Sequence, residues 1–259
     1  MSENQPPINI IQITDPHILA NQNDKFKGIN PYQSLNAVIN HIKSSLWNFD
    51  MIIATGDLTN DNHEKSYANF YRLLQLDNAP VFCIPGNHDT RNKMQSTLPD
   101  SLFFCCENKI KQNWLIIGLD SSIEGSPKGY LSKHELDRLE LIINTSDHEH
   151  IMIYLHHHPL DIGSKWMDEI GLKNKIEFFN VVKKYKNIKA IFCGHIHQSI
   201  EMRYNDIEII GTPSTCRQFK PKSETFSMDS LPPGYRRIQL CQDGSIKTEV
   251  IWLENDIFN

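Results

Sequence analysis

Five short clusters of aspartate, asparagine and histidine are spread along this chain of 259 residues, and each follows an apolar segment. The clusters are Asp15-Pro16-His17, Gly56-Asp57, Gly86-Asn87-His88-Asp89, His156-His157-His158 and Gly194-His195-Ile196-His197. Carboxylate, amide and imidazole groups without a thiolate suit a hard or borderline divalent cation such as Mn²⁺, Fe²⁺ or Zn²⁺. The clusters therefore predict a metal site whose ligands come from distant parts of the sequence.

The clusters offer more ligand atoms than one ion takes, and they suit two ions if one carboxylate bridges them. Two metal ions about 3.5–4 Å apart clamp the attacking and leaving oxygens of a phosphoryl displacement. They also lower the pKa of a bridging water, which becomes hydroxide near neutral pH. We expect Gly56, Gly86 and Gly194 to let the chain turn sharply beside the ions. The pattern predicts phosphoryl chemistry at a dinuclear site.

Each cluster directly follows a short segment with the composition of a buried strand. These predicted strands are Ile8–Thr14, Met51–Ala54, Val81–Ile84, Ile151–Leu155 and Lys189–Cys193. Ligands bind at the carboxyl ends of the strands in α/β sheets, so the five clusters are expected to meet at one edge. A further predicted strand, Leu115–Leu119, carries no such cluster.

Helical patterns alternate with these strands. Apolar residues recur at helical spacing in residues 35–46, 67–74 and 176–185. Ser132 and Glu135 form a capping box that is expected to open a helix running through Leu136, Leu139 and Ile143. The alternation of strands and helices indicates an α/β architecture in the first two-thirds of the chain.

The pattern changes after His197, where antiparallel hairpins are expected. The predicted pairs are 200–204 with 207–210, and 236–240 with 245–252 around the turn Asp243-Gly244. Residues 218–233 are rich in proline, serine and lysine and predict a long loop. We predict one α/β (α+β) domain over residues 1–259. Its motif-bearing part is 8–197, and 198–259 supplies the C-terminal strands and a substrate loop.

Composition and charge exclude several classes of protein. The 26 lysines and arginines against 31 aspartates and glutamates leave a net charge of −5, whereas a non-specific nucleic-acid binder needs a basic face. With 22% charged and 39% hydrophobic residues, the chain has the balance of a globular protein. No segment approaches the roughly 20 apolar residues of a membrane span, and residues 1–7 lack the features of a signal peptide. We therefore expect a cytoplasmic protein.

The pattern of cysteines is typical of a protein in a reducing compartment. None of the six belongs to a C-x-x-C pair, which disfavours a zinc ribbon. Because most lie in apolar segments, we expect buried, reduced thiols, with a redox role for adjacent Cys105 and Cys106 as the minor alternative. The others are Cys83, Cys193, Cys216 and Cys241.

Taken in order, the five clusters resemble the motifs of the calcineurin-like metallophosphoesterases over residues 8–197. Further stretches resemble the class III cyclic nucleotide phosphodiesterases. These are Leu-His-His-His-Pro-Leu at 155–160, Cys-Gly-His-Ile-His-Gln at 193–198, Thr-Pro-Ser-Thr-Cys-Arg-Gln-Phe-Lys-Pro at 212–221 and Pro-Gly-Tyr-Arg at 233–236. The resemblance implies a four-layer αββα sandwich of two mixed sheets flanked by helices.

The resemblance also implies a reaction and its partners. The expected activity is hydrolysis of 3′,5′-cyclic AMP to 5′-AMP by a metal-bridged hydroxide. The expected cofactors are two divalent ions, with Mn²⁺ or Fe²⁺ ahead of Zn²⁺. Cyclic AMP would be the small-molecule partner of a monomer or homodimer, with no nucleic-acid polymer and no membrane involved.

The resemblance assigns a role to each matching position. The first metal would be held by Asp15, His17 and His197, the second by Asn87, His156 and His195, and Asp57 would bridge them. His88 would bind the phosphate and protonate the leaving 3′ oxygen, a role that suits a group with an ordinary pKa near 6.5, and Asp89 would orient it. In the loop after residue 212, Arg217 or Lys220 is expected near the phosphate and Phe219 near the base. The substrate-binding set is then His17, Asp57, Asn87, His88, His197, Arg217 and Lys220.

Several alternatives stay open on the sequence. Alignment on the last His-Pro pair would make His157 the ligand in place of His156. The same scaffold supports hydrolysis of other small phosphate esters, such as a 2′,3′-cyclic nucleotide, a glycerophosphodiester or a nucleotide-sugar lipid. A non-enzymatic scaffold would have lost ligands, and none of the seven positions is lost here; a nuclease would need a basic groove.

The remaining histidines are expected to have no direct part in the chemistry. His157 and His158 follow the ligand position and are expected to support or pack against the site. Five others lie in segments without partners in sequence and are expected on the surface: His41, His63, His134, His148 and His150.

Overall fold

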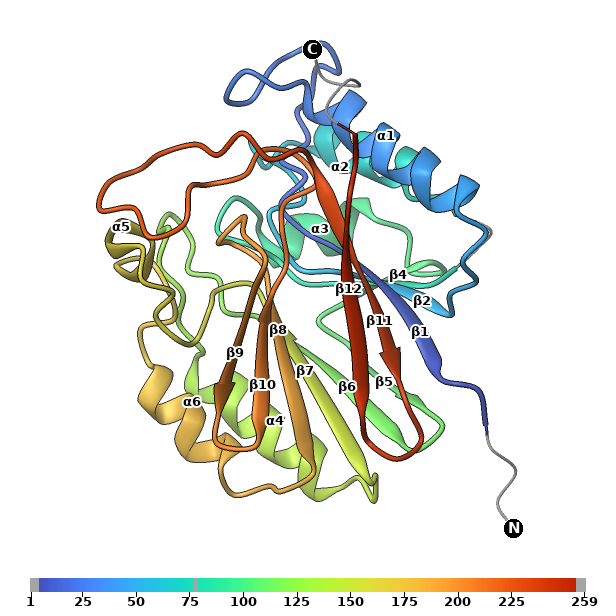
Figure 1. Ribbon diagram of the computed structural model, residues 1–259, viewed down its shortest axis with the longest axis vertical. Coiled ribbons are helices and arrows are strands. Elements are labelled where there is room, and N and C mark those ends of the chain that lie inside the picture. Colours follow the sequence, from blue (N-terminus) through green and yellow to red (C-terminus); the bar gives the residue numbers. More distant parts are fainter. Residues whose placement is uncertain (1–4, 77–78, 255–259) are drawn as a thin grey trace.

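Two six-stranded sheets form the centre of this protein in the computed structural model, which describes residues 5–76 and 79–254 (Figure 1). The first sheet has the strand order β12-β11-β1-β2-β3-β4. Strands β1 to β4 run parallel to one another, β11 pairs antiparallel with β1, and β12 pairs antiparallel with β11. Their bounds are β1 Ile8–Ile13, β2 Met51–Ala54, β3 Val81–Cys83, β4 Phe103–Cys105, β11 Gly234–Leu240 and β12 Ile246–Trp252.

The second sheet has the strand order β5-β6-β7-β8-β10-β9. Its four central strands are parallel, whereas β5 and β9 are antiparallel edge strands. Their bounds are β5 Asn108–Lys111, β6 Trp114–Leu119, β7 His150–Leu155, β8 Ile188–Cys193, β9 Ile200–Tyr204 and β10 Ile207–Gly211.

Helices cover the outer faces of both sheets (Figure 1). Side chains alternate along β6, so Trp114 and Ile116 join the core shared with the first sheet, while Leu115 and Ile117 pack in the cluster that contains α4 and α6 residues. This alternation confirms the predicted four-layer αββα sandwich. The helices are α1 Pro31–Ser44, α2 Glu64–Leu73, α3 Arg91–Thr97, α4 Lys133–Asn144, α5 Lys165–Asp168 and α6 Lys175–Val182.

The predicted strands all form, within one or two residues of their expected ends. Strands β4 and β5 were missed because they are only three and four residues long, and β5 alternates exposed with half-buried side chains at a sheet edge. The Ser132 hydroxyl caps α4 as predicted by accepting a hydrogen bond from the amide of Glu135 at 3.1 Å. Glu135 does not return the bond to Ser132: its carboxylate accepts from the Asp120 amide and from Arg138.

A chain of buried polar groups joins the two sheets near the carboxyl ends of their strands. The Thr212 hydroxyl, just after β10, donates to the Gln12 amide oxygen of β1 at 2.6 Å, and the Gln12 amide nitrogen donates to Thr55 at 3.0 Å. Arg236, fully buried on β11, donates to the Thr212 hydroxyl and to the carbonyl oxygen of Gly211. Because these groups satisfy one another without water, they tie the sheets together directly beneath the predicted site.

The cysteines fit the expectation of buried thiols. All six are free, and five are buried, with Cys241 half-buried. Burial raises the pKa of Cys193 and of Cys216 to about 12, so neither is a reactive thiolate at neutral pH. The Sγ atoms of Cys105 and Cys106 lie 3.9 Å apart, and this contact together with burial raises the pKa of Cys106 well above its ordinary value.

The surface histidines fit their expectation only in part. His63 and His134 are exposed, as expected. His150 instead begins β7, where its side chain is 13% exposed and its ring lies 5.1 Å from that of Trp114. His41 is half-buried and contacts the Tyr235 hydroxyl at 3.2 Å. His148 is half-buried as well. His41 and His150 were misplaced because their packing partners lie far away in the sequence.

Within residues 5–76 and 79–254, no helix combines the length and the apolar composition needed to cross a membrane.

Candidate metal centre and active site

The predicted ligand clusters meet where β1, β2, β3, β7 and β8 end, at one edge of the two sheets. Several of these residues have a left-handed backbone, which costs free energy for residues other than glycine. The loops are held in place by each other: the Asp15 amide donates to the Gly56 carbonyl and the His17 amide to the Asp57 carbonyl, both at 3.0 Å. The positive φ angles are 51° at Asp15, 49° at His17, 49° at Asp57, 67° at His195 and 49° at His197.

The first group of converging side chains comprises Asp15, His17 and His197. His197 Nε2 lies 3.2 Å from Asp15 Oδ1 and 3.3 Å from His17 Nε2. His197 Nδ1 donates to the carbonyl oxygen of Arg217 at 2.5 Å, which leaves its Nε2 lone pair free to bind a metal. This trio matches the residues predicted for the first ion.

The second group comprises His156, His195 and Asn87. His156 Nε2 lies 3.3 Å from Asn87 Oδ1 and 3.2 Å from His195 Nδ1. Its own Nδ1 donates to the carbonyl oxygen of Thr55 at 2.8 Å, so Nε2 is the ring nitrogen that faces this group. These are the residues predicted for the second ion.

The carboxylate of Asp57 lies between the two groups. Its Oδ2 is 3.7 Å from His17 Nε2 and 3.6 Å from His156 Nε2, so one oxygen faces both sets of ligands. Its Oδ1 accepts a hydrogen bond from the amide of His88 at 2.8 Å. The two oxygens therefore have separate functions, and only Oδ2 is placed to bridge.

These residues fit a pair of cations. Asp15 Oδ1 is fully buried and has no well-aligned hydrogen-bond donor among the described residues. Two buried imidazole nitrogens face each other at 3.3 Å in His17 and His197, and their lone pairs repel unless a proton or a cation lies between them. The set contains oxygen and imidazole donors only, which Mn²⁺, Fe²⁺ and Zn²⁺ all accept.

The structure separates His156 from His157, which the sequence left open. His156 faces Asp57 and Asn87, as described above, whereas His157 Nδ1 lies 2.8 Å from the Ser121 hydroxyl. The ring of His157 packs on Gly129, where an added Cβ would come within 2.3 Å of it. These contacts favour His156 as the ligand, but His157 also lies within ligand distance of His156 and His195, so the choice of His156 stays a prediction.

With this geometry in place, comparison with known proteins identifies the family. Residues 8–199 match the calcineurin-like phosphoesterase family. This chain belongs to that family. The 3′,5′-cyclic adenosine monophosphate phosphodiesterase CpdA of Haemophilus influenzae is 39% identical over 247 residues, which cover 95% of this chain and 90% of that protein. CpdA of Escherichia coli is 38% identical over 244 residues, which cover 94% of this chain and 89% of that protein.

A solved structure shows the same fold at much lower identity. The crystal structure of a dimetal phosphatase from Danio rerio matches with a TM-score of 0.68, covering 96% of this chain and 100% of that chain. Its sequence identity is 13%, so this likeness concerns the fold alone.

Two of the three glycines at the site of this phosphoesterase are required for lack of space rather than for a sharp turn. Gly56 has a φ of 96° and turns the chain as expected. Gly86 and Gly194 do not have positive φ, and they are required for a different reason. A Cβ on Gly86 would lie 2.2 Å from Asp57 Oδ1, and a Cβ on Gly194 would lie 2.1 Å from the Thr14 hydroxyl. Gly86 thus lets its loop approach Asp57 closely, and Gly194 lets its loop approach Thr14 and Asp15.

Electrostatics keep the carboxylates of the phosphoesterase ionised. Burial would raise the pKa of Asp57, but His156 and His17 hold the pKa of that carboxyl well below its usual value. Burial likewise opposes ionisation of Asp15, and His197 with His156 lowers its pKa. Burial lowers the pKa of His17 to about 3 and that of His195 well below its usual value, so both rings are neutral and able to bind metal.

His156 differs from the other ligand histidines. Burial would lower its pKa, but the charge of Asp57 and the hydrogen bonds of the ring outweigh it and raise the pKa of His156 to about 9. A proton held in the folded state above the ordinary value of 6.5 stabilises the metal-free fold. That contribution is complete below about pH 6.5 and is lost as the pH rises through 9.

Metal binding is therefore expected to release a proton from His156. At pH 7 the metal must displace this proton, so metal affinity should rise with pH up to about 9, by up to about tenfold per pH unit. Calorimetric titration of the metal-stripped protein with Mn²⁺, in buffers of different ionisation enthalpy, measures the protons released. The control His156→Gln should remove the release. Metal affinity that is independent of pH between 7 and 8 would contradict this assignment.

His88 is oriented by a backbone carbonyl rather than by Asp89. Its Nδ1 donates to the carbonyl oxygen of Asn60 at 3.0 Å, and its ring packs edge-on against His17 at 5.0 Å. The expected contact with Asp89 is therefore wrong. The Asn60 carbonyl leaves Nε2 of His88 available for a substrate.

Asp89 instead holds the two loops that carry Asp57 and His88. Its carboxylate accepts from the amides of Leu58 at 2.9 Å and Gly86 at 3.0 Å, and from further donors. Burial, together with the negative charge of Asp57, raises the pKa of Asp89 to about 6. The remaining donors are the amide and hydroxyl of Thr59 and the Tyr67 hydroxyl.

The loop after β10 contributes in ways that differ from expectation. Phe219, expected near a nucleobase, is 7% exposed and stacks on the His197 ring at 4.0 Å, so it covers a metal ligand. The Arg217 guanidinium donates to the carbonyl oxygen of Lys27, at 3.1 Å from Nη2. Lys220 is exposed on the same loop. The predicted phosphate contacts of Arg217 and Lys220 remain predictions.

Two further residues of the site were missed by sequence reasoning. The Thr14 hydroxyl donates to Asp15 Oδ2 at 2.6 Å and fixes that carboxylate. Phe26 stacks on His17 with ring centroids 4.3 Å apart. A threonine directly before the Asp-x-His motif was a local signal for the first, whereas nothing in the sequence marks Phe26, which reaches His17 only through the folded loop.

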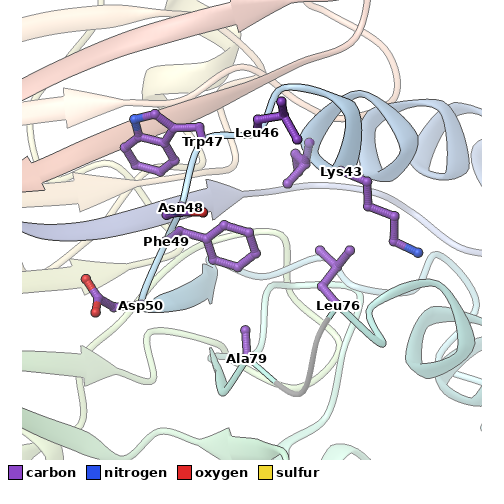
Figure 2. Close-up of a pocket in the computed structure, with 9 residues that line it drawn as sticks. Lys43, Leu46, Trp47, Asn48, Phe49, Asp50, Leu76 and Ala79 are labelled. Atoms are coloured by element: carbon purple, nitrogen blue, oxygen red, sulfur yellow. The ribbon is translucent and has the colours of Figure 1, made fainter.

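A pocket of about 600 Å³ lies away from this site, at the opposite edge of the first sheet. Figure 2 shows Trp47, Phe49, Leu76 and other residues that line it. Asp50, also in its lining, precedes the amino end of β2, whereas Asp57 follows the carboxyl end. The pocket contains none of the predicted site residues and has no part in the chemistry described here.

Proposed function

We propose that this phosphoesterase hydrolyses 3′,5′-cyclic AMP to 5′-AMP with two divalent cations. The observation that carries the proposal is the single oxygen of Asp57, placed 3.7 Å from His17 Nε2 and 3.6 Å from His156 Nε2. The choice of substrate is supported by 39% identity over 95% of the chain to a cyclic AMP phosphodiesterase. Mn²⁺ or Fe²⁺ is the proposed metal, and Zn²⁺ also suits the donors.

The ligands divide between the two cations with one shared group. When bound, the cations supply Lewis acidity to the phosphoryl oxygens and lower the pKa of a water molecule. Asp57 would be common to both ions. The first would be held by Asp15, His17 and His197, and the second by Asn87, His156 and His195.

His88 completes the reaction at the leaving group. The oxygen of a water molecule bonds to phosphorus and the water gives up one proton, while the bond from phosphorus to the 3′ oxygen breaks and that oxygen takes up one proton. The Asn60 carbonyl holds Nδ1 of His88, so the Nε2–H of the protonated ring is the group left to supply that proton. The substrate-contacting set that we propose is His17, Asp57, Asn87, His88, His197, Arg217 and Lys220.

Turnover of a substrate panel after metal removal and add-back tests the proposal. With Mn²⁺ or Fe²⁺ restored, we expect 3′,5′-cyclic AMP to yield 5′-AMP faster than 2′,3′-cyclic AMP or a glycerophosphodiester is hydrolysed. Hydrolysis of either alternative without turnover of 3′,5′-cyclic AMP would replace the proposed substrate. The same assay on Arg217→Ala and Lys220→Ala tests whether these residues contact the phosphate. Unchanged kcat/KM values in a variant would rule out that contact.

Cytoplasmic location, and assembly as a monomer or homodimer, stay predictions.

A further inference from the structure

Aromatic rings extend outward from the metal ligands in two loops. In the loop of residues 25–29, Phe26 stacks on His17, at 4.3 Å between centroids and 19° between planes. In the loop of residues 218–228, Phe219 stacks on His197, at 4.0 Å and 11°. Phe26 and Phe219 each stack on a predicted ligand histidine, so the stacked face of each ring is not available to a substrate.

Phe226 lies one ring further out than Phe219. Its centroid is 5.3 Å from that of Phe219 and 5.2 Å from that of Trp166, with both contacts edge-on. Its side chain is nevertheless 46% exposed. An exposed aromatic ring in direct continuity with a metal ligand is placed at the rim of the catalytic site, not on a remote surface.

Lys27 joins the two loops above this ring. Its Nζ lies 4.3 Å from the Phe226 centroid and 5.2 Å from the Phe26 centroid. The carbonyl oxygen of Lys27 is held by the Arg217 guanidinium, so the backbone of this lysine is fixed while its long side chain remains free. The ammonium group can thus move from the ring face to a neighbouring acceptor.

We propose that Phe226 and Lys27 form the purine-recognition part of the active site. This inference rests on the proposed function, because the metal cluster and His88 engage only the phosphate end of a nucleotide. The base stacks on the exposed face of Phe226, and Lys27 Nζ donates a hydrogen bond to N7, an acceptor that adenine and guanine share. Stacking on an aromatic side chain tolerates either purine, so these residues select the class of base.

Competitive inhibition separates base recognition from phosphate chemistry. Hydrolysis of bis(p-nitrophenyl) phosphate, which has no base, is measured on the metal-loaded enzyme with 5′-AMP or ribose 5-phosphate as inhibitor. We expect 5′-AMP to bind more tightly than ribose 5-phosphate by about fivefold or more, the gain that stacking supplies. The ratio of the two inhibition constants should fall in Phe226→Leu and in Lys27→Met. It should stay unchanged in Phe226→Tyr.

The matched control is Trp47→Leu. Trp47 is also an aromatic residue beneath a cation, with the Arg237 guanidinium 5.2 Å from its ring centre, but it lines the pocket that contains none of the predicted site residues (Figure 2). This variant should leave the inhibition ratio unchanged. Equal inhibition by the two phosphates in the unmodified enzyme, or a ratio that Phe226→Leu does not alter, overturns the inference. Failure of the proposed function would appear separately, as absent turnover of 3′,5′-cyclic AMP with the inhibition ratio intact.

Discussion

Asp57→Asn is expected to lower kcat/KM for 3′,5′-cyclic AMP by at least about a thousandfold, or about 4 kcal/mol of transition-state stabilisation. Asp57 Oδ2 faces His17 Nε2 and His156 Nε2 at nearly equal distances, so the substitution would remove the anionic oxygen that we propose both ions share. An amide carries no charge to offset two dications, and its NH₂ group repels them. Metal affinity should therefore fall together with activity.

The measurement is metal content by elemental analysis together with kcat/KM. We expect Asp57→Asn to fold, because its amide oxygen can still accept the hydrogen bond from the His88 amide. A suitable control is Asp120→Asn, a carboxylate that follows β6 at the same edge of the sheet but bonds to Ser122. That variant should retain both ions and nearly full activity. An Asp57→Asn enzyme with two ions and a tenth of the activity or more would refute the bridging role.

His88→Gln is expected to lower kcat for 3′,5′-cyclic AMP by about 10²- to 10⁴-fold, the range for loss of a positioned general acid. Glutamine can still donate a hydrogen bond to the Asn60 carbonyl, but it has no proton to transfer to the 3′ oxygen. Bis(p-nitrophenyl) phosphate releases a phenolate that needs no proton, so its hydrolysis should suffer much less. Both ions should remain bound.

The metal count distinguishes this role from direct ligation. His88 lies close enough to His17 and Asp57 that a metal-binding role is the competing interpretation. Loss of one ion in His88→Gln, or an equal loss of activity on the two substrates, would favour that interpretation. His134→Gln, an exposed histidine on α4, provides the control and should match the unmodified enzyme in both assays.

Local features of the chain were enough to predict the sheets and the position of the site. Each strand that supplies ligands is a short apolar segment, and the polar cluster begins within a few residues of its end, as for Asp57 after β2 and His156 after β7. In an α/β sheet these ends meet at one edge, so the ligands could be placed together without knowing any contact between them. The short edge strands β4 and β5 lack such a signal, and both were missed.

Roles that depend on the direction of a side chain could not be read in this way. His156 and His157 are adjacent and chemically identical, yet one faces Asp57 and the other faces Ser121. Asp89 is adjacent to His88 but binds the loop amides of Leu58 and Gly86. Adjacent residues at a strand end point in different directions, so nearness in sequence does not establish contact.

The sequence by itself determined the kinds of side chain that could bind metal and the edge of the sheets where they gather, because these follow from residue type and strand pattern. Only the tertiary structure decided which Asp57 oxygen faces both His17 and His156, which of the adjacent histidines faces it, and which aromatic rings stack on His17 and His197. Those features arise from contacts between loops that are far apart in the sequence, such as Phe26 with His17 and Lys27 with Phe226. Such contacts depend on how two sheets pack against each other, which no local pattern records.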